Sequence, residues 1–304
     1  MLNLHLNRQF DIISIGECMV ELCRTQGENH FKMSFGGDTL NVIVAASRLG
    51  GKTGYITKVG NDMFGDYLLE CFKKENIDIA CIKQCSAPTG IYFIINAPDR
   101  GHKFIYYRKN SSASFLKYQD IDINYLKKAK IIHTSGITQA ISKSCQQLVK
   151  KILKTVKKYD CIISYDTNLR LNLCDIEEAK QNFNEILEYI DIIFLNFPYE
   201  SENLLELKNP QEIFKYLHLK GIKIVILKTG KDGCIISYNQ QQNKIHGNKD
   251  IKVIDTSGAG DAFAGAFLYA LCNKLIPYNC AEFANKIAQM TISKHGTVNS
   301  YVFD

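Results

Sequence analysis

Short apolar strands alternate with amphipathic helices over most of the sequence after residue 125, and this alternation restricts the fold more than any other feature. The strands are rich in β-branched residues, and each is followed by a stretch with helical periodicity. We expect strands at 131–134, 161–165, 192–195 and 223–228, and helices at 142–158, 176–189, 199–207 and 210–219. Such alternation predicts right-handed βαβ crossovers, and therefore an α/β fold with helices on both faces of a mainly parallel sheet.

The pattern before residue 125 is mixed. Residues 10–16 and 55–59 have strand composition, whereas residues 38–49 and 64–75 carry apolar side chains at helical spacing. Two β-rich segments, 17–36 and 89–107, do not fit the alternation, and the second has the pattern of a hairpin around residues 97–101. Ligands bind at the carboxyl ends of the strands in an open α/β sheet. We therefore expect both segments to form a small β-sheet lid there, within one domain spanning residues 1–304.

The stretch 253–267 combines an anion-binding turn with a potential base. It begins with β-branched residues, which predict a strand, turns through Ser-Gly-Ala-Gly at 257–260, and continues as a helix of small and apolar residues. Free amide groups at a helix N-terminus favour an anion, and glycine lets a phosphate approach the backbone. Asp261 beside such a turn can take a proton from an attacking hydroxyl group. The alternative is that Asp261 only caps the helix and the glycines only shape the turn.

A second polar cluster is predicted at the start of helix 38–49. A Gly-Gly turn at 36–37 frees backbone amides, and Asp38 and Asn41 follow at i and i+3 in the first helical turn. Side chains so placed can bind neighbouring hydroxyl groups of a sugar. Asp38 can also serve simply as a helix cap.

Two further polar segments follow predicted strands. Asp166, Asn168 and Arg170 alternate directly after strand 161–165, so all three can face one site, although a structural turn with a surface arginine is the alternative. Lys228 begins a segment with glycines at 230 and 233, which is equally compatible with an ordinary hairpin turn.

Two of these motifs resemble signatures of the ribokinase-like (PfkB) carbohydrate kinases. They are Asp-Thr-Ser-Gly-Ala-Gly-Asp at 255–261 and Gly-Gly-Asp-Thr-Leu-Asn at 36–41. Within that family the chain looks most like the 2-keto-3-deoxygluconate kinases, through residues 16–22, 90–93, 104–114, 135–137 and 166–170. The resemblance runs from about residue 11 to residue 296. It implies the ribokinase-like three-layer α/β/α fold with a small β-sheet lid.

The resemblance also implies an activity, namely phosphorylation of 2-keto-3-deoxy-D-gluconate by ATP and Mg²⁺ to the 6-phosphate. Asp261 would be the general base, and the amides of Gly258, Ala259 and Gly260 would form the anion hole. An arginine fork suits the carboxylate of a sugar acid. The implied substrate-binding residues are Gly37, Asp38, Thr39, Leu40, Asn41, Tyr92, Tyr106, Tyr107, Arg108 and Arg170. The implied nucleotide-binding residues are Asn168, Leu169, Arg170, Lys228, Gly230, Gly233, Ser257, Gly258, Ala259, Gly260 and Asn285.

The sequence departs from the family pattern at two positions. Tyr199 stands where many relatives have an acidic residue near Mg²⁺, with Glu200 one residue later, so no metal ligand is assigned. Thr297 stands where some sugar-acid kinases have an aspartate that contacts substrate. The alternatives are therefore a fructokinase- or ribokinase-type kinase of a neutral sugar, or a sugar-binding relative without activity. No Gly-x4-Gly-Lys-Ser/Thr motif occurs, which excludes a P-loop kinase.

Charge and cysteine content exclude several other classes of protein. The net charge of +6 is dispersed, and no basic run with interleaved aromatic residues predicts a nucleic-acid groove. The sequence has no apolar segment typical of a membrane span or signal peptide, so we expect a cytoplasmic protein. The 11 cysteines are scattered, which favours reduced thiols over a disulfide framework. Because the lid often doubles as a dimer surface in the family, a homo-oligomer is expected.

Overall fold

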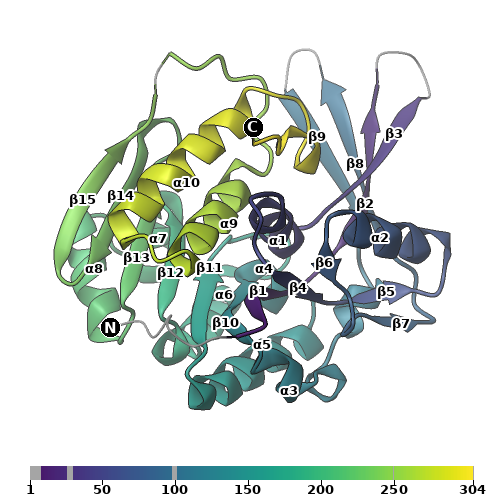
Figure 1. The fold of residues 1–304 in the computed structure, drawn as a ribbon, viewed down its shortest axis with the longest axis horizontal. Helices are drawn as coiled ribbons and strands as arrows, with labels where there is room; N and C mark the ends of the chain where they lie inside the picture. Colours follow the sequence, from purple (N-terminus) through teal and green to yellow (C-terminus); the bar gives the residue numbers. More distant parts are fainter. Residues whose placement is uncertain (1–7, 26–29, 98–100, 249, 304) are drawn as a thin grey trace.

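Strands rich in Ile, Val and Leu form the central sheet of the computed structural model, which describes residues 8–25, 30–97, 101–248 and 250–303 (Figure 1). Both faces of the inner strands at 10–15, 162–166, 192–196 and 224–228 are buried, which explains their mostly apolar sequences, whereas the edge strand at 241–246 is polar and mostly exposed. Across the sheet the order is β15 (Gln241–His246), β14 (Gly233–Tyr238), β13 (Ile224–Lys228), β12 (Ile192–Asn196), β11 (Ile162–Asp166), β10 (Ala129–Ser135), β1 (Phe10–Ile15), β4 (Thr53–Ile56) and β6 (Ile77–Asp78). All neighbouring pairs from β13 to β6 are parallel, and β14 and β15 add an antiparallel hairpin at one edge.

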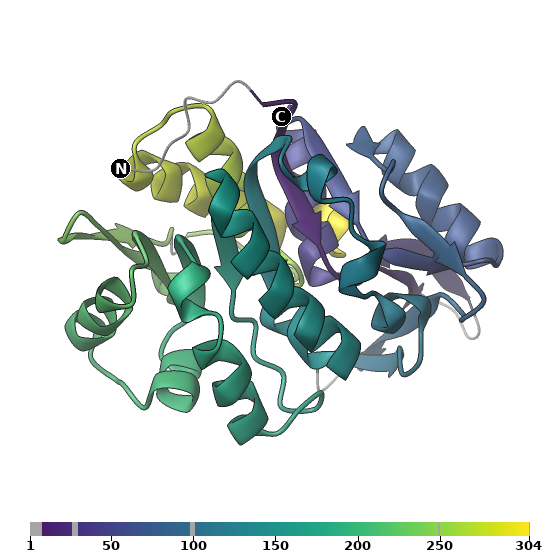
Figure 2. The ribbon, with the colours of Figure 1, turned by 90° about the horizontal axis from the view of Figure 1, so that it is seen from below.

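Helices cover both faces of this sheet and give the three-layer α/β/α architecture predicted from the sequence (Figures 1 and 2). Consecutive strand residues face opposite layers, so that Ile12 belongs to one hydrophobic core and Ile13 to the other. The first core contains side chains of α1 (Asp38–Arg48), α2 (Met63–Lys74), α9 (Ala259–Cys272) and α10 (Pro277–Ile292). The second contains side chains of α3 (Ile123–Leu126), α5 (Lys143–Val156), α6 (Ile176–Asn184), α7 (Tyr199–Leu205) and α8 (Pro210–Leu219), and α4 (Gly136–Ala140) packs against α5. No helix in the described ranges has the length and apolar character needed to cross a membrane.

The two β-rich segments that interrupt the alternation form the smaller sheet, as predicted. Its strand order is β3 (Phe31–Gly36), β2 (Met19–Arg24), β8 (Gly90–Ala97) and β9 (Gly101–Tyr107), and it stands away from the central sheet in Figure 1. Residues 26–29 of the first segment and 98–100 of the expected hairpin turn lie outside the described residues. A separate pair is formed by β5 (Lys58–Gly60) and β7 (Lys83–Cys85).

Three sequence-based assignments of secondary structure are wrong. The strand expected at the beginning of the stretch 253–267 does not form, because the amides of Ile254 and Asp255 donate to the carbonyl of Ile292 at the end of α10 rather than to a neighbouring strand. The single strand expected at 55–59 is divided between β4 and β5, which belong to different sheets. The helix expected at 176–189 ends at Asn184 and is followed by a short 3-10 turn.

Candidate active site

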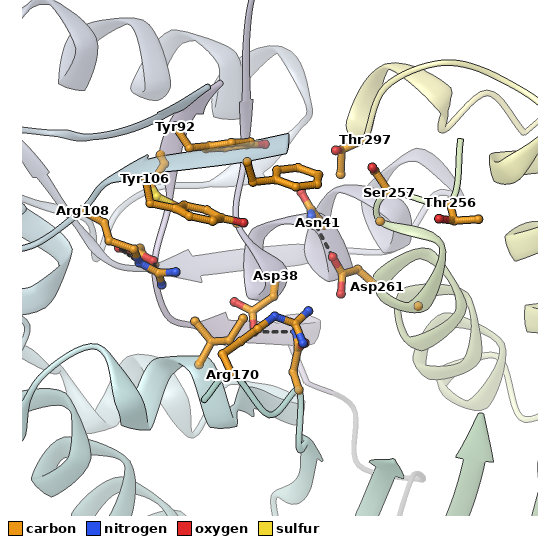
Figure 3. A pocket seen from close by; sticks show the side chains of 18 of the residues that line it. Asp38, Asn41, Tyr92, Tyr106, Arg108, Arg170, Thr256, Ser257, Asp261 and Thr297 are labelled. Atoms are coloured by element: carbon orange, nitrogen blue, oxygen red, sulfur yellow. Dashed lines mark hydrogen bonds and ion pairs between the residues drawn. The ribbon is translucent and has the colours of Figure 1, made fainter. Parts of the chain in front are cut away.

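A cavity of about 430 Å³ lies at the carboxyl edge of the central sheet, beneath the smaller sheet (Figure 3). Asn196 and Lys228 end parallel strands at this edge, and Asn168 follows another. Tyr92 and Tyr106 of the smaller sheet line the opposite side. Open α/β sheets bind their ligands at this edge, so the cavity is the candidate substrate site.

The N-terminal turn of α1 contributes two polar side chains to the cavity. A side chain at Gly37 would place its Cβ 2.2 Å from the carbonyl oxygen of Glu17, so glycine is required for this close approach. Asn41 Nδ2 donates to Asp261 Oδ2 at 2.7 Å, and Asn168 Nδ2 donates to Asp38 Oδ2 at 3.2 Å. The other side-chain oxygens of Asp38 and Asn41 are buried and have no hydrogen-bond partner among the described residues. Both are therefore acceptors available to the hydroxyl groups of a ligand.

Asp261 lies in the first turn of α9, directly after the glycine-rich turn. Gly258 has a φ of 73°, and its carbonyl accepts a hydrogen bond from Tyr301 Oη at 2.6 Å, which fixes the turn against the C-terminal segment. Burial and then the neighbouring Asp38 carboxylate raise the pKa of Asp261 to about 8, against the hydrogen bond from Asn41, which lowers it. A carboxyl group with a pKa near the working pH is suited to general-base chemistry.

A second cavity of about 630 Å³ lies on the other side of the glycine-rich turn. Its walls include Phe263 and Ile292, and its polar side includes Asn285, whose Nδ2 donates to the carbonyl of His246 at 2.9 Å. The residues that line both cavities are Asn196, Lys228, Thr256 and Gly260. The two cavities therefore meet at the N-terminus of α9, where a helix favours a bound anion.

Lys228 places a buried cation at this junction. Its Nζ forms an ion pair with Asp166 Oδ2 at 2.6 Å and lies 3.5 Å from the position that a Cβ on Gly260 would occupy. Burial alone would lower the pKa of Lys228, but the nearby carboxylates, Asp166 first, outweigh it and raise this pKa. Burial also raises the pKa of Asp166 to about 6, although the charge of Lys228 opposes this shift. The lysine is thus held charged beside the glycine-rich turn.

The smaller sheet contributes aromatic rings and one arginine to the cavity. Tyr92 and Tyr106 stack with ring centroids 5.7 Å apart, and the Arg108 guanidinium lies 5.4 Å from the centroid of the Tyr106 ring. The Tyr92 hydroxyl donates to the buried carboxylate of Glu21. Arg108 donates through Nε to Glu17 Oε1 at 3.3 Å and through Nη2 to Glu17 Oε2. One edge of the arginine fork that the sequence offers to a substrate carboxylate, formed by Nε and Nη2, is therefore already bound to a carboxylate of the protein.

Comparison with known proteins identifies the family to which this site belongs. The sequence pattern of the pfkB family carbohydrate kinases matches residues 9–302. The chain belongs to this family. It is 28% identical to a 2-dehydro-3-deoxygluconokinase of Thermoproteus tenax, over 94% of this chain and 89% of that protein. It is also 28% identical to a probable fructokinase of Arabidopsis thaliana, over 94% of this chain and 88% of that protein. A candidate ribokinase II from E. coli, solved with ATP and Mg²⁺, superposes with a TM-score of 0.87 at 26% identity, covering 96% of each chain.

In this pfkB kinase, three of the residues predicted to bind substrate have side chains that lie away from the cavity: Thr39, Leu40 and Tyr107. Thr39 and Leu40 are buried, Leu40 in the core and Thr39 beside Tyr55, with 3.2 Å between their hydroxyl oxygens. They lie away from the cavity because only one face of α1 borders it. Tyr107 is 66% exposed and packs against Phe93 on the outer face of the smaller sheet. Successive residues of a strand point to opposite faces, and Tyr106 occupies the inner one.

The predicted nucleotide-binding residues divide between the two cavities. Arg170, Ser257 and Gly258, like Asn168, line the first cavity, whereas the second is lined by Gly230, Gly233, Ala259 and Asn285. Leu169 borders neither cavity, because its side chain is buried and its amide donates to Glu200 Oε1 at 2.8 Å.

The departure from the family pattern around Glu200 has a structural explanation. The Glu200 carboxylate is buried and accepts hydrogen bonds from the backbone and side-chain nitrogens of Asn196 at 2.7 and 3.0 Å, and from the Thr167 hydroxyl. Both carboxylate oxygens of Glu200 therefore already accept hydrogen bonds from other residues of the protein. Within the part of the chain that the structure describes, no group of three His, Cys, Asp or Glu residues could hold a metal ion. The residues present do not fit a metal site built from protein carboxylates.

Glu17 was not among the predicted site residues, yet it lines the first cavity. A usable signal was present, because Glu17 follows β1, and a polar residue directly after a parallel strand is a candidate for the site. Thr297, which was noted as a departure, also lines this cavity, and its hydroxyl donates to Glu21 Oε2 at 3.4 Å.

Proposed function

We propose that this pfkB kinase transfers the γ-phosphoryl group of ATP to the primary hydroxyl group of 2-keto-3-deoxy-D-gluconate and forms the 6-phosphate. The observation that carries the proposal is the position of Asp261 between two sets of features. On one side lie Asp38 Oδ1 and Asn41 Oδ1, which accept no hydrogen bond from the described residues and are suited to the hydroxyl groups of a sugar. The glycine-rich turn and the second cavity lie on the other, suited to the phosphates and base of a nucleotide.

In this proposal the Asp261 carboxylate accepts the proton of the primary hydroxyl as its oxygen attacks the γ-phosphorus. The bond from this phosphorus to the β–γ bridging oxygen breaks, and ADP leaves with that electron pair. Phosphoryl transfer spreads negative charge over the phosphoryl oxygens, so positioning and electrostatic stabilisation provide most of the catalysis. The amides of Gly258, Ala259 and Gly260 would supply hydrogen bonds to that charge.

The nucleotide assignment is supported by the fit of the second cavity. Its apolar wall, with Phe263 and Ile292, suits a purine, and its junction with the first cavity lies at the α9 N-terminus. The E. coli relative solved with ATP and Mg²⁺ supports the same cofactors here. Bound Mg²⁺ would neutralise phosphate charge, and among the described residues no group of three His, Cys, Asp or Glu side chains could hold it without the nucleotide.

A neutral sugar such as fructose is the second candidate substrate, and one observation favours it. Arg108 borders the cavity, but its positive charge is already paired with Glu17. Arg170, by contrast, is exposed and donates from Nη1 to the neighbouring Leu169 carbonyl at 3.0 Å, which leaves the rest of its fork available for a substrate carboxylate.

The deciding experiment is a coupled-enzyme measurement of ADP formation with 2-keto-3-deoxygluconate, 2-keto-gluconate, fructose and ribose. We expect the highest kcat/KM with 2-keto-3-deoxygluconate. A preference for fructose or ribose would retain the kinase assignment and overturn the sugar-acid assignment. Absence of turnover with all four sugars, together with intact sugar binding, would support a non-catalytic protein instead.

We also propose that the smaller sheet mediates homo-oligomer formation through its outer face. This face carries large apolar side chains with substantial exposure, including Tyr107 at 66% and Met33 at 40%. Exposed apolar patches on a sheet are typical of protein interfaces.

A further inference from the structure

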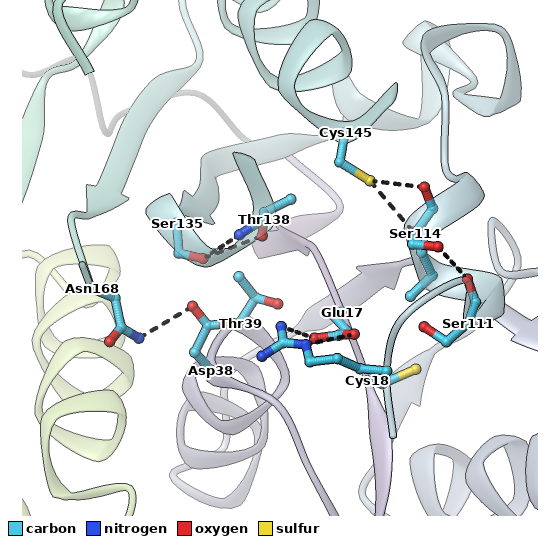
Figure 4. A network of polar contacts seen from close by, with 12 residues as sticks. Glu17, Cys18, Asp38, Thr39, Ser111, Ser114, Ser135, Thr138, Cys145 and Asn168 are labelled. Carbon is cyan, nitrogen blue, oxygen red and sulfur yellow. Dashed lines mark hydrogen bonds and ion pairs between the residues drawn. The ribbon is translucent and has the colours of Figure 1, made fainter. Parts of the chain in front are cut away.

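Glu17 occupies a position that the proposed reaction does not explain. It lies in the loop between β1 and β2, and its side chain is only 2% exposed although it borders the cavity (Figure 4). Its two carboxylate oxygens accept from two different nitrogens of Arg108, whose side chain is 12% exposed. A buried bidentate pair of this kind is costly to break, because it leaves a charge without a partner.

This pair changes what Arg108 offers to a ligand. A guanidinium recognises a carboxylate best through two parallel N–H groups, and two of the Arg108 nitrogens already donate to Glu17. A substrate carboxylate at Arg108 would have to bind through Nη1 and the remaining N–H of Nη2, and it would lie close to the negative charge of Glu17, which already neutralises the guanidinium. A neutral sugar meets neither obstacle, because its hydroxyl groups can donate to Glu17.

We propose that Glu17 sets the preference of this site between sugar acids and neutral sugars, by competing with the substrate carboxylate for the positive charge of the Arg108 guanidinium. This inference rests on the proposed sugar-kinase function and names the residue that decides its substrate class. It holds whichever class the wild-type protein prefers, since it concerns the ratio of the two specificities.

The competition depends on the charge of Glu17. Burial raises the pKa of Glu17 to about 7, Arg108 opposes the shift, and the neighbouring Asp38 carboxylate adds to it. A protonated Glu17 releases Arg108 and can donate to a substrate carboxylate, so the ratio of sugar-acid to neutral-sugar specificity falls as the pH rises through 7. The titratable groups that interact electrostatically with Glu17 are Arg108, Asp38, Cys18, Tyr55, Tyr106 and Cys145.

The test compares Glu17→Gln with wild type, with 2-keto-3-deoxygluconate and fructose as substrates at pH 6 and pH 8. Glutamine keeps the size of the side chain and an acceptor for Arg108 but removes the charge. We expect the ratio of kcat/KM values, sugar acid over fructose, to rise at least about tenfold at pH 8, the scale of one charged hydrogen bond. At pH 6, where the wild-type carboxyl is largely protonated, the rise should be smaller. Taking a ratio cancels the titration of Asp261, which both substrates share.

Glu75→Gln is the matched control, because Glu75 forms the same kind of bidentate pair with Arg48, at 2.7 and 2.6 Å, and does not line either cavity. It should leave the ratio unchanged. An unchanged or lower ratio in Glu17→Gln would overturn the inference and make Glu17 a positioning residue for Arg108. Calorimetric binding of both sugars without nucleotide gives the same ratio independently of turnover. If the wild-type protein phosphorylates neither sugar, the proposed function fails, but the ratio of the two sugar affinities still decides the role of Glu17. If the wild-type protein binds neither sugar, both proposals are overturned.

Discussion

Replacing Asp261 with asparagine tests the proposed base with little change in shape. Asparagine retains an oxygen that can accept from Asn41 Nδ2, which now donates to Asp261 Oδ2 at 2.7 Å, so the cavity should keep its geometry. The variant cannot accept the proton of an attacking hydroxyl. We expect kcat to fall by roughly 10²–10⁴-fold, the usual contribution of a positioned base. This corresponds to about 2.7–5.5 kcal/mol of lost transition-state stabilisation.

The same substitution should have the opposite effect on stability. The pKa of Asp261 rises from 3.8 to about 8 in the folded chain, chiefly through burial. Between these values the folded protein binds a proton that the unfolded chain has released, so this group makes the unfolding free energy fall as the pH rises. The slope is at most about 1.4 kcal/mol per pH unit and vanishes above the folded pKa. An asparagine at this position does not titrate and contributes no such slope, so the stability of the Asp261→Asn variant relative to wild type should increase from pH 5 to pH 8.

Steady-state kinetics and urea unfolding at pH 5 and pH 8 provide the two measurements. Asp66→Asn is a suitable control, because Asp66 is exposed on α2 and accepts a 3.2 Å hydrogen bond from Gln84, away from both cavities. It should leave both kinetics and the pH dependence unchanged. Turnover of Asp261→Asn near the wild-type level would refute the assignment of the base. An equal stability difference at both pH values would show that the Asp261 carboxyl is not held protonated in the fold.

Three further outcomes follow from the structure. Lys228→Met should lower kcat by roughly 10²–10³-fold, the range for losing an electrostatic donor, with KM for the sugar little changed in steady-state kinetics. Gly258→Ala should destabilise the protein in urea unfolding by more than Gly221→Ala, because both positions have positive φ but only at Gly258 would a Cβ meet another side-chain atom, at 2.5 Å. Tyr107→Glu should shift the protein to monomers in light scattering, whereas Leu219→Glu, also on an exposed surface, should not; an unchanged mass would exclude the outer face of the smaller sheet as the interface.

The layered fold could be predicted because each buried strand carries its own signal. Strands such as β12 and β13 are apolar on both faces, a pattern that parallel sheets require and that surface strands do not show. The assignment of a strand at the beginning of the stretch 253–267 failed for the complementary reason. Val253 and Ile254 favour an extended backbone, but a strand also needs a neighbouring strand, and the end of α10 occupies that place.

The parts of the site that lie within one motif could also be predicted. Asp38 and Asn41 share a helical turn, and Asp261 follows the glycines directly, so local geometry alone brings these groups to the carboxyl edge of the sheet. The same reasoning, applied fully, would have separated Tyr106 from Tyr107, because alternate strand residues face opposite sides. Tyr106 and Tyr107 were both predicted to contact substrate on the basis of the family resemblance. Strand periodicity, which determines which side chain faces the cavity, was not applied to them.

The charged pairs could not be predicted, because their partners come from distant elements. Glu17 and Arg108 are 91 residues apart, and Asp166 and Lys228 are 62 residues apart. An arginine in a predicted lid suggests a receptor for a substrate carboxylate only if its fork is free, and a lysine at a turn suggests a catalytic cation only if it is buried beside the reacting atoms. Tertiary packing decides both conditions, because it pairs Arg108 with Glu17 and buries Lys228 beside Asp166. We therefore expect the substrate class of this kinase to depend less on the presence of Arg108 than on the carboxylate that already binds it.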